Sequence, residues 1–493
     1  MRGKDLKKAW YATREGLQAP LVMYFIAMIL LGLGNTFTTE SVTLGMLLSA
    51  LKYCGALIKA CFPLFLVINV LGKRHSDSVP VIGGVISYVL LHVVTMFMAE
   101  QDLPKVYYNS FDAGGTELTS SIGRMPLNMG LIVSIIVIVL IVYLYRSSRQ
   151  RFNYGILRFI DNDSWFMILV VVSTLVVGAV VSWIYPHIVR VVDVDFSFVS
   201  RNSNNPAAMF IYGLTERIME IFGMENTIHA CFWFGSTGGN WLASNGSTYI
   251  GDVNIWTAQL AANAVQPGVG KYITPYYVIN MAIVPAILLG IYCQYSSKLE
   301  RRKMLGLFIL AVATSMMSSS MIPLEYLLLI ISPALLFISM VLTSTLYGLF
   351  ISLGIWLGYT YTGPLTYAMP GTLMNFLDIS KYMSKGSLIT FGIVTVVYFV
   401  LSFLLVWTYY RVLAQDFLEP QTKVQTRREM IRALGGIQNI SVIDCTPFAM
   451  QVALFDNSRI DEDAIMSLGA TKIRETYFYY DIEFGPGSVS LCH

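Results

Sequence analysis

Long apolar stretches, separated by short polar or irregular segments, follow one another from the N-terminus to about Trp407. About 20 consecutive apolar residues cross the hydrocarbon core of a bilayer, and several of these stretches reach or approach that length. The stretches are 20–33, 79–98, 129–145, 165–184, 276–292, 305–312, 324–341 and 388–410. The pattern therefore predicts a polytopic α-helical membrane protein with about eight to ten spans. The irregular gaps favour broken or re-entrant helices that are buried in protein.

One segment between the apolar stretches is poorly suited to face lipid. Residues 193–251 mix small, amide, charged and aromatic side chains. Because charge inside a bilayer is costly, it normally faces a cavity or a partner. We therefore expect this segment to lie within the protein, between a first membrane block at about 1–190 and a second at about 276–410.

The C-terminal residues follow a different pattern. A polar, helix-breaking linker at 415–426 is followed by helical segments at 427–434 and 461–468, and by strand-like segments at 450–455 and near 476–484. The predicted order is helix, strand, strand, helix, strand, strand, and about seventy residues suffice for a small α+β sandwich. The chain is therefore predicted to comprise a membrane domain (1–414), the linker (415–426) and a soluble α+β domain (427–493).

Composition and charge agree with this division and add an orientation. Hydrophobic residues make up 55% of the chain and charged residues only 13%, well below the quarter or so that is usual in soluble domains. Basic residues cluster at 73–74, 146–151, 298–303 and 411–432. The range 100–119 is mostly acidic and polar, and Lys105 is its only basic residue. Because positively charged loops stay in the cytoplasm, both termini are expected there, with an even number of spans. The first apolar stretch is interpreted as a transmembrane helix and not as a cleaved signal.

Several kinds of chemistry have no support in the sequence. The six cysteines form no CxxC pair, and the five histidines form no HExxH motif, so no metal site is predicted. No P-loop, dinucleotide-binding glycine motif or nucleophile elbow is present, which argues against an ATP-driven pump and against a bound cofactor. The basic residues serve topology, and no nucleic-acid partner is expected.

Residues 433–470, ALGGIQNISVIDCTPFAMQVALFDNSRIDEDAIMSLGA, are more specific. They resemble the IIB domain of the bacterial phosphoenolpyruvate-dependent sugar phosphotransferase system, glucose/maltose branch. The membrane part resembles the IIC domain of the same branch at 73–88, 210–234, 255–260 and 281–344. The resemblance implies a homodimeric IICB sugar permease of the bacterial inner membrane with about ten transmembrane helices. A IIA protein would donate the phosphoryl group in trans, because no IIA domain is visible.

In this family a phosphocysteine on IIB phosphorylates a sugar that is bound in the IIC cavity. Cys445 is the corresponding candidate phosphoryl acceptor, and the alternative is an ordinary loop cysteine. The family loop has an aspartate followed by cysteine, threonine and two arginines at fixed spacing. Alignment on Asp444 places Thr446 at the position of the cysteine, and Ala449 and Gln451 at the positions of the arginines. Arginine and backbone amides are the groups that would hold a phosphoryl dianion.

The resemblance also assigns a sugar-binding set in the membrane domain. Glu225 and Asn226 occupy the positions of the family's paired histidines, and His229 follows nearby. The family's substrate-binding glutamate is replaced by Ile322, whereas a second glutamate of that motif is retained as Glu325. The predicted substrate-binding residues are therefore Glu225, Asn226, His229 and Glu325.

Each of these residues also has a purely structural interpretation. Glu225 and Asn226 would cap a re-entrant helix by side-chain hydrogen bonding. Glu325 would brace a hairpin against backbone amides, and His229 would be a packing residue. Glu216 and Arg217, which also match the family, would form a structural ion pair, and the aromatic run 232–234 would pack at a helix end.

Two functions follow from the sequence. The first is an IICB permease that translocates and phosphorylates a glucose- or maltose-like sugar through Cys445. The second is a family member without phosphotransfer, acting as a non-phosphorylating sugar carrier or as a membrane sensor or regulator.

Overall fold

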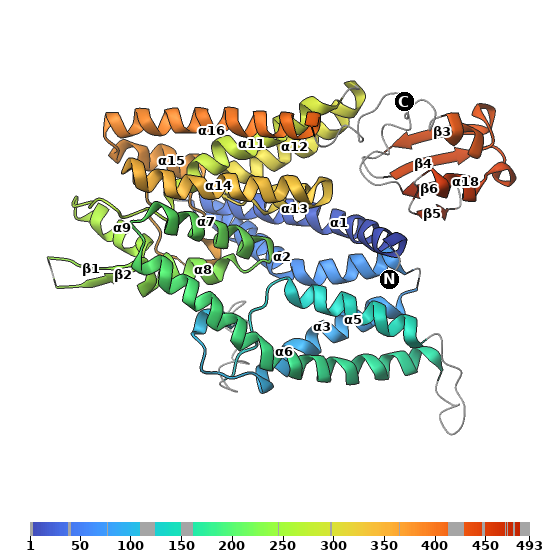
Figure 1. Ribbon diagram of the computed structural model, residues 1–493, viewed down its shortest axis with the longest axis horizontal. Helices are drawn as coiled ribbons and strands as arrows, with labels where there is room; N and C mark the ends of the chain where they lie inside the picture. The colour runs from blue at the N-terminus through green and yellow to red at the C-terminus, as the bar shows by residue number, and fades with distance from the viewer. Residues whose placement is uncertain are drawn as a thin grey trace.

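The computed structural model consists of a body of long helices and a small four-stranded unit beyond one end of it (Figure 1). The structure describes residues 3–37, 41–75, 77–108, 124–148, 161–244, 246–295, 298–363, 365–412, 428–445, 449–468, 470, 472–476 and 479–483. The predicted linker at 415–426 lies outside these residues.

The body is helical, and seven of its segments are long and apolar enough to cross a membrane among the residues described above. They are Ala19–Thr36 in α1 (Gly3–Thr36), α2 (Val42–Arg74), α3 (Val79–Met98), α6 (Asn162–Arg201), Thr274–Gln294, α14 (Pro333–Leu353) and Lys385–Arg411 in α16 (Lys385–Val412). The segment Thr274–Gln294 joins α10 (Thr274–Val278), a π-helical turn (Ile279–Ile283) and α11 (Val284–Gln294). Shorter apolar helices are α5 (Ile132–Ser148), Met304–Ser318 in α12 (Lys298–Ser318) and α13 (Ile322–Ile331).

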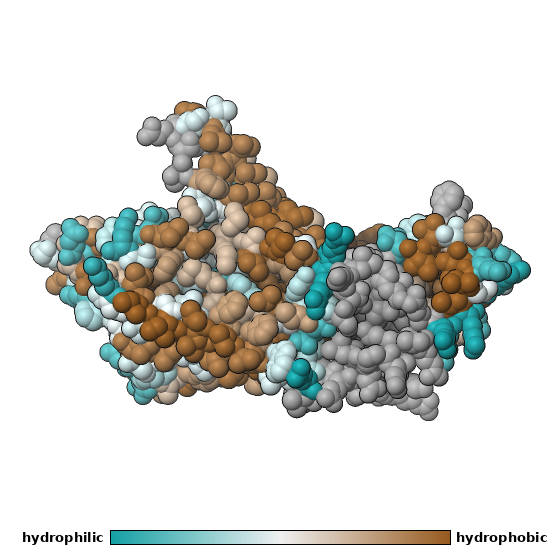
Figure 2. Space-filling model, turned by 90° about the horizontal axis from the view of Figure 1, so that it is seen from above, coloured by the Kyte–Doolittle hydropathy of each residue, from teal (hydrophilic) through white to brown (hydrophobic). Residues whose placement is uncertain are grey.

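These helices agree with the predicted class, a polytopic helical membrane protein. Figure 2 shows apolar residues over much of one face of the body and hydrophilic residues toward its two ends. Side chains such as Val139, Trp183 and Val396 are largely exposed, as expected of residues that face lipid.

The helices of the structure differ from the predicted apolar stretches in two places. The helix α2 is absent from the predicted stretches, because Lys52 and Lys59 interrupt its apolar pattern. The stretch 324–341 was expected to be continuous, but it divides into α13 and α14 at Ser332. Ser332 has extended backbone angles (φ −157°, ψ 106°), because the residue before a proline is disfavoured in the helical region. Its hydroxyl then accepts a hydrogen bond from Leu335 N and caps α14.

Small residues allow the helices of the body to pack closely. A Cβ at Gly55 of α2 would lie 2.6 Å from Ala27 O of α1, so these two backbones touch. In the same way Gly213 of α7 (Pro206–Ile221) meets the ring of Tyr347 in α14. Both contacts require a residue without a side chain.

The sequence predicts that the segment 193–251 lies within the protein, and this holds only in part, because 204–207 and 246–248 are exposed whereas 224–225 and 227–229 are buried. It contains the end of α6, then α7, α8 (Glu225–Phe232) and an antiparallel hairpin of β1 (Asn240–Leu242) and β2 (Thr248–Ile250). The helix α9 (Asp252–Ala261) follows, and α15 (Leu373–Ile379) lies later in the chain. The charged residues Glu216, Arg217 and Glu220 of α7 are buried.

The C-terminal unit is a small antiparallel sheet with helices against it. Its strands are β3 (Ile440–Cys445), β4 (Ala449–Leu454), β5 (Lys472–Glu475) and β6 (Tyr480–Glu483), in the order β3-β4-β6-β5. A helical segment at 428–433 and α18 (Glu462–Ser467) complete it. Their side chains form a separate core with the strands, from Met430, Leu434, Val452, Ile465 and Ile482. The predicted order of helices and strands agrees with this arrangement.

The sheet contacts the body at the end of α2. Lys73 Nζ lies 3.2 Å from Glu483 Oε1 of β6, and Lys472 Nζ of β5 donates to Lys73 O at 2.8 Å. A lysine at the exposed carbonyls of a helix C-terminus is favourable for both charge and hydrogen bonding. Basic groups converge here: burial, and after it the charges of Arg74 and Arg146, lower the pKa of His75.

Candidate functional site

The candidate site begins with α7, whose charged residues lie deep in the body. Asn205 starts the helix by accepting a hydrogen bond from Ala207 N, and Pro206 occupies its first turn. Arg217 and Glu216 are fully buried, and Glu220 is 5% exposed. Burial of so many charges is stable only if they are paired.

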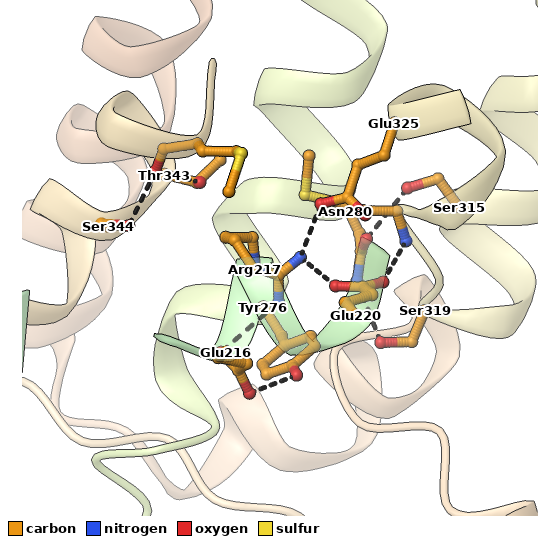
Figure 3. A network of polar contacts seen from close by, with 12 residues as sticks. Glu216, Arg217, Glu220, Tyr276, Asn280, Ser315, Ser319, Glu325, Thr343 and Ser344 are labelled. Atoms are coloured by element: carbon orange, nitrogen blue, oxygen red, sulfur yellow. Dashed lines mark hydrogen bonds and ion pairs between the residues drawn. The ribbon is translucent and has the colours of Figure 1, made fainter. Parts of the chain in front are cut away.

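Arg217 makes those pairs (Figure 3). Its Nη1 lies 2.5 Å from Glu220 Oε2 and 3.9 Å from Glu325 Oε1, and its Nη2 lies 3.4 Å from Glu216 Oε2. The guanidinium carbon also lies 5.4 Å from the ring centroid of Tyr276. We call Glu216, Arg217, Glu220 and Glu325 the buried ionic cluster.

Hydroxyl groups surround Glu216. Tyr276 Oη donates to its Oε1 at 2.5 Å and Tyr212 Oη at 3.3 Å, while the Tyr347 hydroxyl donates to Oε2. His229 Nε2 lies 3.2 Å from the same Oε1 and 2.9 Å from Tyr276 Oη. Glu216 therefore has its lone pairs largely occupied by protein groups, which is the pattern of a structural carboxylate.

His229 has a packing contact as well as these polar ones. Its ring stacks on Trp233, with centroids 3.6 Å apart and an angle of 11° between the planes. Both residues come from the end of α8, and both line the cavity described below. His229 is thus a well-anchored residue whose ring also forms part of a cavity wall.

Glu225 is paired with a lysine from another helix. It is the first residue of α8, where the helix dipole favours a negative charge. Its Oε1 lies 3.0 Å from Nζ of Lys59, which α2 contributes. Its Oε2 is buried and accepts no hydrogen bond from the residues that the structure describes.

Glu325 does not make the hydrogen bonds to backbone amides that its structural interpretation requires. Neither of its carboxylate oxygens has a hydrogen-bond partner in the described part of the chain, so it does not hold the hairpin through backbone amides. That contact is made by Glu220, whose Oε1 accepts from Met321 N at 3.1 Å. Glu325 instead faces Arg217.

A neutral network adjoins the cluster and fixes the turn before α13 (Figure 3). Asn280 receives a hydrogen bond from Ser315 at 2.9 Å and donates to Ser319 at 3.0 Å. Asn280 lies in the π-helical turn, and Ser319 has a positive φ of 58°. Positive φ angles are unfavourable for residues other than glycine, so the side-chain network that holds Ser319 in this conformation stores backbone strain near the site.

These elements enclose a small cavity of about 40 Å³, which we call the inner cavity. Of the predicted substrate-binding residues, Glu225, Asn226 and His229 line it. Glu325 is not among its lining residues. Side chains that sequence reasoning did not select also line it: Lys59, Glu220, Tyr276 and the serines Ser318–Ser320.

Two sequence signals could have found the missed residues. Lys59 is a lone cation in the apolar stretch GALIKACF, and such a residue inside a membrane helix normally faces a partner. Glu220 follows Arg217 by three residues, so the two share a helix face. Tyr276 gives no comparable signal, because tyrosines are common in this chain.

The candidate phosphoryl acceptor lies in the C-terminal unit. Cys445 was expected in a loop, but it is the last residue of β3, opposite Met450 of β4. The loop region expected after it begins at residue 446, and 446–448 lie outside the described residues. The strand extends to Cys445 because residues 440–445 pair with β4, with one register shift near Ile440.

Comparison with known proteins places this architecture in a family. The model of the phosphotransferase system EIIC family matches residues 14–344. A relative described as the glucose-specific EIICBA component of a phosphotransferase system, from Staphylococcus saprophyticus, is 24% identical over 497 aligned positions. That alignment covers 97% of this chain and 71% of the relative. With about two thirds of its length matched by the family model, including Glu225, Asn226 and His229, the chain belongs to the EIIC family of phosphotransferase-system sugar permeases.

Proposed function

We propose that this chain is an IICB permease that moves a glucose- or maltose-like sugar across the bacterial inner membrane and phosphorylates it. The observation that carries the proposal is the convergence of Glu225, Asn226 and His229 on one cavity. Glu225 and Asn226 were chosen from the sequence by their match to the family's sugar site and His229 because it follows them closely, and α2 adds Lys59 beside Glu225.

The lining of the inner cavity suits a neutral sugar. Glu225 Oε2 has no hydrogen-bond partner among the described residues and can accept a hydrogen bond from a sugar hydroxyl, while Oε1 pairs with Lys59. Asn226 offers both donor and acceptor groups, and the stacked rings of His229 and Trp233 form an amphipathic wall. Such a combination of few polar groups with aromatic surface is usual in small-molecule sites.

The volume of the inner cavity indicates a closed state. About 40 Å³ holds a few water molecules, whereas small-molecule pockets typically measure about 300 Å³ or more. Sugar entry would therefore require the walls to separate. The serines Ser318–Ser320 and the segment 368–370 form part of the wall, and a hydrogen bond from Ser319 to Pro370 O joins them.

In the proposed reaction the sugar hydroxyl oxygen attacks the phosphorus of a phosphocysteine at Cys445. The new O–P bond forms as the S–P bond breaks, and the sulfur leaves as a thiolate. Glu225 takes the hydroxyl proton as general base. The C-terminal unit would face the cytoplasm, where a separate IIA protein rephosphorylates Cys445, and the permease would work as a homodimer.

A second candidate is a sugar carrier, or a membrane sensor or regulator, that has lost phosphotransfer. One observation favours it: Ala449 and Gln451 stand where the family has phosphate-binding arginines. In addition, Ile322 lines the inner cavity at the position of the family's glutamate. Sugar binding would remain, and only the chemical step would be absent.

Phosphoryl labelling separates the two candidates. Membranes that contain the full chain would be incubated with labelled phosphoenolpyruvate, the general phosphotransfer proteins, a IIA protein and sugar, with Cys445→Ser as the matched control. Label on Cys445 and formation of sugar phosphate support the IICB permease. Sugar binding without label contradicts it and supports the second candidate. Absence of both label and sugar binding contradicts both.

A further inference from the structure

The structure contains a second pocket that is larger than the inner cavity. Its volume is about 470 Å³, within the range of small-molecule sites. It is formed by the β1–β2 hairpin, by α9 and by residues near Tyr361, at the end of the body away from the C-terminal unit (Figure 1). We call it the outer pocket.

The lining of the outer pocket is aromatic and polar but uncharged. Phe234, Tyr249 and Tyr361 contribute rings, and Thr248, Asn254 and Thr257 contribute hydroxyl and amide groups. Among the residues that the structure describes, no acid or base lines it. Rings that cover the apolar face of a ligand, together with neutral donors and acceptors at the edges, match a sugar ring with its hydroxyls.

The rings are held in place by the surrounding structure. Tyr361 stacks on Tyr359 with centroids 5.5 Å apart, and it meets Phe234 edge-on at 6.5 Å. Tyr361 N donates to Thr257 Oγ1 at 3.3 Å, which ties this segment to α9. A Cβ at Gly358 would lie 2.1 Å from the Trp256 ring, so the segment and α9 are in close contact. A preformed aromatic wall loses little conformational entropy when a ligand binds.

The outer pocket also adjoins the inner cavity. Phe234 lines the outer pocket, and its neighbour Trp233 lines the inner cavity. The segment after Tyr361 continues to Leu365 and Met369, which line the inner cavity as well. The two sites are thus lined by neighbouring residues of the same two segments, although charged side chains line only the inner cavity among the described residues.

From this geometry we propose that the outer pocket is a second binding site, for a neutral sugar, on the approach to the inner cavity. The proposal rests on the proposed function, because it takes the inner cavity as the translocation site. With the C-terminal unit in the cytoplasm, the outer pocket faces the outside and collects sugar before translocation. Because it contains no cation, it does not retain a sugar phosphate.

Binding stoichiometry tests this proposal. The full chain in nanodiscs would be titrated calorimetrically with maltose and with D-glucose, and with glucose 6-phosphate as the charged comparison. We expect two classes of site for the neutral sugars. Tyr361→Ala should weaken the outer site about tenfold, because it removes a stacking surface, while Tyr361→Phe preserves binding. Glu225→Gln should weaken only the inner site.

The possible outcomes are distinct. A single class of site that Glu225→Gln weakens and Tyr361→Ala leaves unchanged overturns the outer site but leaves the proposed function intact. Absence of sugar binding in the unmodified chain overturns the proposed function itself. Binding of glucose 6-phosphate as tightly as glucose at a site sensitive to Tyr361→Ala would contradict the neutral character assigned to the outer pocket. Elution of each variant as a single species in size-exclusion chromatography verifies its folding.

Discussion

Arg217 compensates the negative charge of three buried carboxylates in the interior of the body. It is fully buried and is the cation of a cluster with three carboxylates, those of Glu216, Glu220 and Glu325. A fully buried ion pair contributes little net stability compared with an apolar replacement of both partners. Removal of one partner is different, because the remaining charges stay buried without compensation.

We therefore expect Arg217→Met to lower the free energy of unfolding by about 3–5 kcal/mol. Thermal unfolding in nanodiscs would measure this as a lower midpoint and a reduced yield of monodisperse protein. The matched control is Arg190→Met, because Arg190 pairs with Glu100 while both side chains are 60% exposed, and exposed pairs contribute about 1 kcal/mol or less. Equal midpoints for the two variants would contradict the structural role assigned to Arg217.

Residue identity at the inner cavity could be predicted only in part. Glu225 and Asn226 were found through their family positions and His229 through its closeness to them in sequence, and all three line the cavity. The ion pair between Lys59 and Glu225 joins residues 166 positions apart on two helices, and spacing within a single helix does not reveal such a contact. Glu325 was placed in the substrate-binding set, but it pairs with Arg217 and is not among the described residues that line the cavity.

Among the helices, the close contact between α7 and α14 positions Glu216 of the buried ionic cluster. Gly213 of α7 faces Tyr347 of α14, and the Tyr347 hydroxyl donates to Glu216. A Cβ at Gly213 would lie 2.4 Å from Tyr347 Cδ2 and 3.0 Å from Ser344 Cα. Since both atoms belong to a packed helix, the two helices would have to separate.

Gly213→Ala is expected to destabilise the protein by about 1–3 kcal/mol, the usual cost of inserting atoms into a packed interface. Gly392→Ala in α16 is the control, because nothing lies within 4 Å of its Cβ position. That variant should be neutral or slightly stabilising, by about 0.5–1 kcal/mol, since alanine favours helix. Thermal midpoints of both variants check the prediction, and a stable Gly213→Ala protein would refute the close α7–α14 contact.

The apolar pattern predicts the elements better than it predicts their breaks. The stretch 79–98 has the bounds of α3, and the helices and strands of the C-terminal unit follow the expected order. The pattern missed α2, because its lysines face protein partners and not water. The π-helical turn at Ile279–Ile283 and the extended Ser332 depend on tertiary contacts and on a following proline, which hydropathy alone does not report.

At the scale of the whole molecule, the C-terminal unit docks on α2 through few polar contacts. Glu483 of β6 faces both Lys73 of α2 and Arg474 of β5, at 3.2 Å and 3.6 Å. Lys472 Nζ caps the helix at Lys73 O. Partly exposed ion pairs of this kind contribute little to stability, so these polar contacts hold the unit only weakly.

Lys73→Glu should loosen this docking, because it places a second carboxylate beside Glu483. A partly exposed pair of this kind contributes about 1 kcal/mol or less, so hydrogen exchange in β5 and β6 should rise only about a few-fold. Lys105→Glu makes the same charge change at an exposed residue in another part of the chain and should leave this exchange unchanged. Equal exchange for the two variants would show that the Lys73 contact does not hold the sheet.

The central claim is that the inner cavity binds and passes a sugar that is phosphorylated in the process. It is tested most directly by uptake of radiolabelled glucose and maltose into vesicles that contain the full chain, with and without phosphoenolpyruvate and its transfer proteins. We expect accumulation as sugar phosphate only with the donors present, and a rate lowered about 100-fold or more by Glu225→Gln, because an amide cannot take the proton of the attacking hydroxyl. Uptake that is no faster than in vesicles without the protein, under both conditions, would contradict it.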